Sequence, residues 1–82
     1  MFHKVKNVIP IDNMQLVVEF MDDNKKLYDI KPLTNKWSVF KGLYSKELFE
    51  NVRVDFGGYG IVWNEEIDLS CNELWDNGKT IT

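Results

Sequence analysis

The first third of the chain alternates apolar and polar residues, which is the period of a β-strand with one buried face. Three such segments, residues 3–11, 14–21 and 25–31, predict three strands. The side chains on their expected inward faces are Val5, Ile9 and Ile11, then Leu16, Val18 and Phe20, then Tyr28 and Ile30. The polar cluster 22–24 between the second and third segments is typical of a hairpin turn.

The middle of the chain changes to a helical period. Leu33, Trp37, Phe40 and Tyr44 follow the spacing i, i+4, i+7, i+11. This spacing predicts one α-helix in the segment 33–44 with all four side chains on its inward face, and Gly42 weakens the middle of this helix or marks its early end. Thr34 or Asn35 is the expected N-cap, and one short helical turn is expected after Ser45.

Two further strands and a turn follow. Val52, Val54 and Phe56 alternate with polar residues and predict a fourth strand. Ile61–Trp63 predicts a short fifth strand, with Trp63 on a face expected to point inward. The glycines of the segment 57–60 between them predict a tight turn with positive φ. A phosphate-binding loop is disfavoured here, because such a loop opens a helix rather than joining two strands.

The last helix has clear start and stop signals. Ser70 and Glu73 have the spacing of a capping box, and Gly78 stands where a helix would end. Cys71, Leu74 and Trp75 form the expected inward stripe, and residues 79–82 are expected to fray. The resulting order, β-β-β-α-β-β-α, predicts a two-layer α+β domain: a mostly antiparallel five-stranded sheet with two helices on one face.

Length and composition restrict the function. The 82 residues allow one domain over 1–82, with a core at about 3–77. The net charge of −3 and the single arginine, Arg53, make direct nucleic-acid binding an unfavourable interpretation. No apolar run is long enough for a membrane span or a signal peptide, and the only cysteine, Cys71, forms no intrachain disulfide. The expected location is the cytoplasm.

Several short motifs carry a family resemblance. They are Val39-Phe40, Leu43, Leu48-Phe49, Val52, Val54-Asp55, Val62-Trp63-Asn64, Asp68-Leu69 and Leu74-Trp75. Over roughly residues 5 to 76 the chain resembles the bacterial family called domain of unknown function 2442. Asp23-Asn24 stands where relatives usually have Asp-Gly, and Cys71-Asn72 stands where they usually have a proline. The resemblance implies the same element order and no assigned functional residue. Relatives stand alone or beside helix-turn-helix segments and small partner proteins, some in suspected toxin–antitoxin pairs.

The candidates for chemistry are few. His3 has no obvious partner in sequence and is expected at an exposed or strand-edge position. Cys71 falls at the first turn of the last helix, which favours a packed side chain over a redox or nucleophilic thiol. Asp68 is expected to bind nearby backbone N–H groups and to order the loop after Trp63. The acidic pairs 22–23 and 65–66 fall in turns, where they are expected to be solvated rather than to bind a metal.

These patterns predict no catalytic, cofactor-binding or metal-binding residue. The leading hypothesis is a non-enzymatic protein-interaction or accessory module that docks through a sheet edge of the first hairpin, or associates with itself there. The alternative hypothesis is a DNA-linked regulator, or an antitoxin-like partner of a small toxin or helix-turn-helix protein. An enzyme would rest on Asp55, Asp68 and Cys71 alone.

Overall fold

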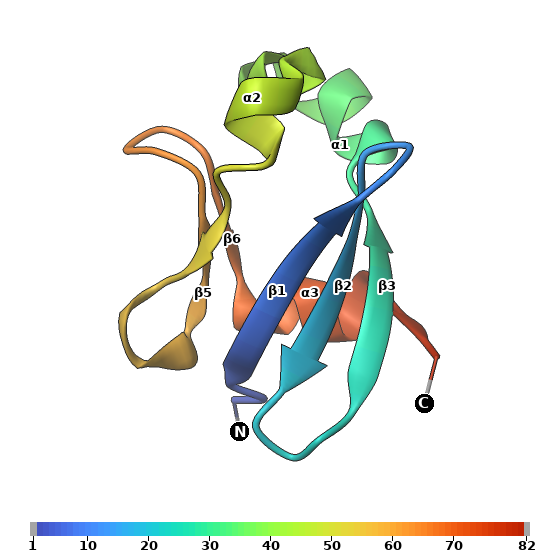
Figure 1. Ribbon diagram of the computed structural model, residues 1–82, viewed down its shortest axis with the longest axis vertical. Coiled ribbons are helices and arrows are strands. Elements are labelled where there is room, and N and C mark those ends of the chain that lie inside the picture. Colours follow the sequence, from blue (N-terminus) through green and yellow to red (C-terminus); the bar gives the residue numbers. More distant parts are fainter. Residues whose placement is uncertain (1, 82) are drawn as a thin grey trace.

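The computed structural model describes residues 2–81 and shows an α+β fold with two antiparallel sheets. The strands are β1 (Val5–Ile11), β2 (Gln15–Phe20), β3 (Lys25–Asp29), β4 (Arg53–Val54), β5 (Gly60–Val62), β6 (Asp68–Ser70) and β7 (Lys79–Thr80). One sheet has the order β1-β2-β3-β7 and the other has the order β4-β5-β6 (Figure 1). The prediction of a single five-stranded sheet is therefore wrong, whereas the α+β class and the antiparallel pairing are confirmed.

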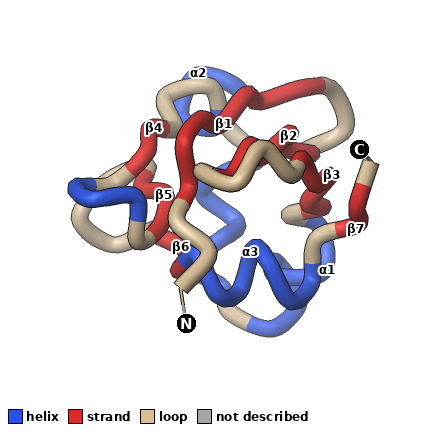
Figure 2. Tube along the Cα trace, turned by 90° about the horizontal axis from the view of Figure 1, so that it is seen from below, coloured by secondary structure: helices blue, strands red, loops and turns tan. Residues whose placement is uncertain are grey.

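The sequence predicted that the helices lie together on one face of one sheet, but in the structure they do not. They are α1 (Lys31–Lys36), the 3₁₀ helix η1 (Ser38–Tyr44), α2 (Lys46–Phe49), the 3₁₀ turn η2 (Phe56–Gly58) and α3 (Cys71–Asn77). Helix α3 lies behind strands β1 to β3, and α1 and α2 lie together at the end of the molecule near the β1–β2 turn (Figure 1). Seen from below, α3 faces these strands across the core (Figure 2). Among the described residues, no helix is long and apolar enough to cross a membrane.

The first sheet stops at β1, although β4 contacts that strand. The free edge of β1 is poor in donors, because Pro10 has no N–H and the Val8 N–H donates to the Asn7 side-chain oxygen at 3.0 Å. The backbone of Gly58 also lies against this strand, where a Cβ would stand 2.7 Å from the Val5 carbonyl oxygen. A backbone ladder needs regularly spaced donors. The second half of the chain therefore builds its own sheet.

A β-bulge between Val5 and Asn7 changes which residues of β1 face inward. Val5 and Val8 are buried, whereas Ile9 and Ile11 are exposed on the outer face of the sheet. The prediction that all three apolar residues Val5, Ile9 and Ile11 point inward is wrong beyond the bulge. Strands β2 and β3 match the predicted pattern, with Leu16, Val18, Phe20, Tyr28 and, just after β3, Ile30 buried.

The predicted helix over 33–44 is two short helices. Trp37 has extended backbone angles (φ −134°, ψ 117°) and ends α1 before η1 begins. The tighter 3₁₀ turn aligns residues three apart, so Phe40 and Leu43 are buried while Trp37 and Tyr44 are exposed. Neither predicted N-cap is used, because α1 begins at Lys31 with a proline in its first turn.

Strand β4 is shorter than predicted. The Asp55 carboxylate accepts a hydrogen bond from the Phe56 N–H at 2.8 Å, and the Gly58 N–H donates to the Asp55 carbonyl at 3.0 Å. These bonds begin a turn at Asp55, so Phe56 is 95% exposed instead of continuing the strand. Gly57 and Gly58 have the predicted positive φ. The strand β6 was not predicted, because only one of its three residues, Leu69, is apolar, whereas all three residues of the predicted strand 61–63 are apolar.

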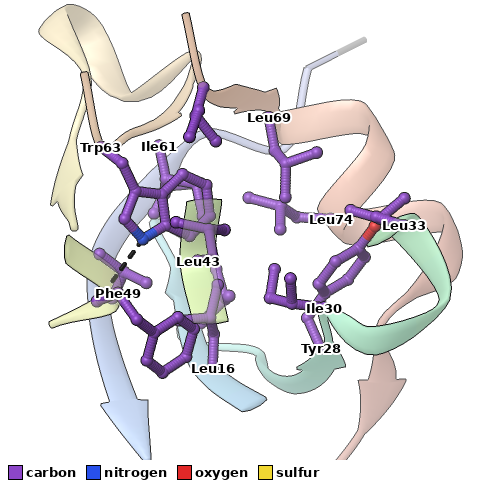
Figure 3. Close-up of a cluster of buried hydrophobic side chains, with 14 of the residues drawn as sticks. Leu16, Tyr28, Ile30, Leu33, Leu43, Phe49, Ile61, Trp63, Leu69 and Leu74 are labelled. Carbon is purple, nitrogen blue, oxygen red and sulfur yellow. Dashed lines mark hydrogen bonds between the residues drawn. The ribbon is translucent and has the colours of Figure 1, made fainter. Parts of the chain in front are cut away.

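The core lies between the first sheet, α3 and the short second sheet. Trp63 is buried beside Ile61 and Leu43, and its indole Nε1 donates to the Phe49 carbonyl at 3.1 Å (Figure 3). Leu74 from α3 contributes a fully buried side chain to the same cluster. The predicted inward positions of Phe40 and Trp63 are confirmed.

Helix α3 follows its predicted boundaries. The Ser70 hydroxyl accepts from the Glu73 N–H at 3.1 Å, and the Gly78 N–H donates to the Leu74 carbonyl at 3.0 Å. A Cβ at Gly78 would stand 2.5 Å from that carbonyl oxygen, so the close approach requires glycine. The sequence predicted that residues 79–82 fray, but Lys79–Thr80 pair with β3 as strand β7. Thr82 lies outside the described residues.

Candidate docking groove

His3 has a partner that its position in the sequence did not reveal. The half-buried imidazole stacks on Trp75 with ring centroids 3.5 Å apart, and its Nδ1 lies 3.6 Å from an Asp22 oxygen. The Asn24 backbone N–H, which donates to Asp22, is the main reason that the pKa of this carboxyl lies below its ordinary value, and His3 lowers it further. His3 therefore helps to cover Trp75.

Cys71 and the acidic pairs occupy the positions that the sequence predicted. The thiol is 1% exposed at the start of α3 and belongs to the core. The pairs 22–23 and 65–66 are exposed in turns. Between residues 2 and 81, no three His, Cys, Asp or Glu side chains gather closely enough to hold a metal ion.

The loop after Trp63 is ordered by Asn64, not by Asp68 as predicted. The Asn64 side-chain oxygen accepts from the N–H groups of Glu66 and Ile67, each at 2.9 Å. Asp68 lies exposed on β6. An Asn that accepts hydrogen bonds from the backbone two and three residues later is a common loop signal. The sequence therefore contained this signal at Asn64, whereas the prediction relied on Asp68.

One hollowed part of the surface surrounds Trp37. Two adjoining hollows of about 300 Å³ and about 360 Å³ lie on either side of this residue and share Leu33, Trp37 and Glu73 in their walls. We call this feature the Trp37 groove. The first hollow adds Tyr28, Asp29, Pro32, Lys36 and Asn77, and the second adds Val39, Phe40, Glu66, Asp68, Leu69 and Ser70.

The groove has an apolar floor and one aromatic wall. Leu33, Phe40 and Leu69 are buried beneath it, whereas Trp37 is 55% exposed and Val39 is 37% exposed. The Trp37 ring lies 6.3 Å from the Phe40 ring. Its backbone is fixed on both sides, because its N–H donates to Leu33 at 2.9 Å and its carbonyl accepts from Phe40 at 3.1 Å. The indole is therefore presented on an ordered part of the chain.

The opposite wall is acidic and comes from β6, its preceding loop and α3. It carries Glu66, Asp68 and Glu73. Glu73 is held in place by Tyr28, whose O–H donates to Oε2 at 2.7 Å, and by Asn77, which donates to the same oxygen at 2.9 Å. Burial, followed by this bond to Glu73, raises the pKa of Tyr28 well above its ordinary value, so the phenol remains a donor.

The sequence placed Trp37 in the core, so this groove was missed. What turns the Trp37 side chain out of the core is its extended backbone (φ −134°, ψ 117°), which separates α1 from η1, and the spacing of apolar residues in the sequence does not reveal this break. The outer face of the first sheet is a second exposed apolar surface. There Ile9, Val17 and Leu27 stand opposite one another across three strands.

The sequence comparisons address the family and not the groove. No curated protein and no solved structure matches the chain. Residues 5–80 match the family described as "Protein of unknown function (DUF2442)", which agrees with the expected resemblance and extends it by four residues. Because the match covers nearly the whole described chain, the protein belongs to the DUF2442 family.

Proposed function

We propose that the protein is a non-enzymatic interaction module that binds a segment of a partner protein in the Trp37 groove. The observation that carries this proposal is the position of Trp37, which is 55% exposed on an ordered backbone between two hollows with an apolar floor. Exposed Trp residues in well-packed surroundings are frequent energetic centres of protein interfaces. A small domain gains little stability from a Trp side chain that remains mostly in water.

The proposal moves the docking surface away from the first hairpin. The free edge of β1 is poor in donors, as described above for Pro10 and Val8, and β7 covers part of the β3 edge. Strand β6 is an edge strand of the second sheet, and all three of its residues line the groove. Docking through a sheet edge thus remains part of the proposal, at β6.

The proposal includes a cytoplasmic location, since the buried free thiol of Cys71 suits a reducing compartment. A partner that itself binds DNA, or is a small toxin, would make the module a regulator through that partner. Direct DNA binding receives no support from the net charge of −3.

A capture experiment tests the groove. Tagged wild-type protein, Trp37→Ala and Phe56→Ala are compared for the proteins they retain from native extract, with quantification by mass spectrometry. Phe56→Ala is the matched control, because it also removes an exposed aromatic side chain but lies outside the groove. We expect a partner that wild type and Phe56→Ala retain and Trp37→Ala loses at least about tenfold. Equal retention by wild type and Trp37→Ala would contradict the proposal, and light scattering would show whether the retained partner is a second copy.

A further inference from the structure

The charges of the Trp37 groove are divided unevenly between its walls. Glu66, Asp68 and Glu73 line one wall, and none of them forms an ion pair with a residue in the described part of the chain. Both hydrogen bonds to Glu73 use Oε2, so Oε1 has no bond among the described side chains. Asp29, at the far end, is already paired with Lys31 at 2.9 Å.

The aromatic wall also suits a cation. The Lys36 ammonium lies 5.7 Å from the centre of the Trp37 ring, so the ring already carries a positive group over one face. Lys36 is exposed on a flexible stem and is the only cation lining either hollow. The three unpaired carboxylates and this one ammonium give the groove a net charge of −2 (−3 + 1).

The shape of the groove favours an extended occupant. The two hollows on either side of Trp37 can each receive one apolar side chain above the buried floor of Leu33, Phe40 and Leu69. The open edge of β6 runs along the acidic wall. A strand added to such an edge alternates its side chains between the sheet faces, so apolar and charged residues can be separated.

We propose that the Trp37 groove binds an extended segment of a partner protein in which Arg or Lys side chains alternate with apolar side chains. The apolar side chains enter the hollows beside Trp37. The cations face Glu66, Asp68 and the open oxygen of Glu73, and one guanidinium stacks on the indole in place of Lys36. This inference rests on the proposed function and adds the chemistry of the bound segment.

Fluorescence anisotropy with labelled synthetic peptides tests the inference. The probe is a short peptide that alternates Arg and Leu, and the comparison peptide carries Gln in place of every Arg. At low salt we expect the Arg–Leu peptide to bind at least about tenfold more tightly, which corresponds to two or three exposed charge pairs. Raising the salt to about 300 mM should remove most of this difference.

Matched variants locate the effect. Glu66→Gln with Asp68→Asn removes two groove charges, and Asp12→Asn with Glu47→Gln removes two exposed charges outside the groove. The groove pair should weaken binding of the Arg–Leu peptide about five- to tenfold, whereas the control pair should change it less than about twofold. Circular dichroism of each variant establishes that it is folded.

The results distinguish docking in the Trp37 groove from the cationic character of the bound segment. If Trp37→Ala weakens binding of both peptides while the groove charge variants change nothing, the cationic occupant is refuted and docking in the groove stands. If the control pair weakens binding as much as the groove pair, the attraction is general and the inference is also refuted. If none of the variants changes binding, or neither peptide binds, both the cationic occupant and its docking site are overturned.

Discussion

Replacing Trp63 by Ala should destabilise the fold by about 3–5 kcal/mol. The side chain is 1% exposed, and its Nε1 donates to the Phe49 carbonyl at 3.1 Å. A buried Trp removes about 150–250 Å² from water, which at about 25 cal/mol per Å² gives about 4–6 kcal/mol. The unfolded chain already buries part of this area, so that figure is an upper bound. Since domains are stable by roughly 5–15 kcal/mol, the substitution removes between about a fifth and all of the free energy of unfolding.

Trp37→Ala is the matched control, because it removes the same atoms from a side chain that is 55% exposed. Because somewhat less than half of the Trp37 side chain is buried, we expect less than half of the Trp63→Ala cost, at most about 2 kcal/mol. Urea unfolding followed by far-UV circular dichroism measures both variants. With a slope of about 1 kcal/mol per M for a small domain, the midpoint should fall by about 3 M or more for Trp63→Ala and by at most about 2 M for Trp37→Ala.

Trp63→Phe keeps the experiment decisive if Trp63→Ala does not fold at all. The phenyl ring preserves most of the packing but cannot donate to the Phe49 carbonyl, and a buried acceptor without a partner costs about 1–3 kcal/mol. The reasoning is refuted if Trp63→Ala lies within about 1 kcal/mol of wild type. It is equally refuted if truncation of Trp37 and of Trp63 cost the same.

Three further outcomes follow from single positions. Gly58→Ala should cost about 1–3 kcal/mol in urea unfolding, because φ is +80° and the added Cβ meets a backbone oxygen of β1 at 2.7 Å; an unchanged midpoint would count against this close approach. Burial and the bond to Glu73 raise the pKa of Tyr28 in the folded protein. The protonated phenol therefore adds its full share to the free energy of unfolding below the unfolded pKa of about 10, and this share declines as the pH rises above that value. Unfolding measured from about pH 8 to pH 12 should show this decline in wild type and a smaller decline in Tyr28→Phe; equal slopes would disprove the linkage. Asn64→Ala should lower the free energy of unfolding by about 1–2 kcal/mol, because two backbone N–H groups lose their acceptor. Asp68→Ala should change it by less than about 0.5 kcal/mol. If Asp68→Ala costs more than Asn64→Ala in urea unfolding, Asp68 and not Asn64 orders the loop.

The elements that the sequence predicted well are those whose signals are local. The alternation in β2, the capping serine of α3 and the positive φ of Gly57 and Gly58 each depend on residues a few positions apart. The short turn after Ser45 is confirmed as α2 for the same reason. In these places propensity and tertiary structure agree, so a pattern in the chain is sufficient.

The misplaced elements depend on contacts between distant segments or on a single extra residue. A bulge of one residue exposes Ile9, and no spacing rule announces it. Residues 79–80 form a strand only because β3 presents an unpaired edge there. The split into two sheets follows from the donor-poor edge of β1, where Pro10 was visible in the sequence but the bond from Val8 to Asn7 was not.

The sequence did not predict the candidate groove, because the predicted helix continued through Trp37, whose extended backbone ends α1 in the structure. The sequence assigned all three tryptophans to the core, yet the structure gives them three roles. Trp63 is enclosed, Trp75 is half-buried beneath His3 and Lys26, and Trp37 stands in the groove. A side chain that contributes little to stability can be removed without unfolding the domain. Truncating Trp37 therefore tests binding in a domain that remains folded, whereas truncating Trp63 tests the stability of the fold, and the same chemical change at two positions distinguishes the two contributions.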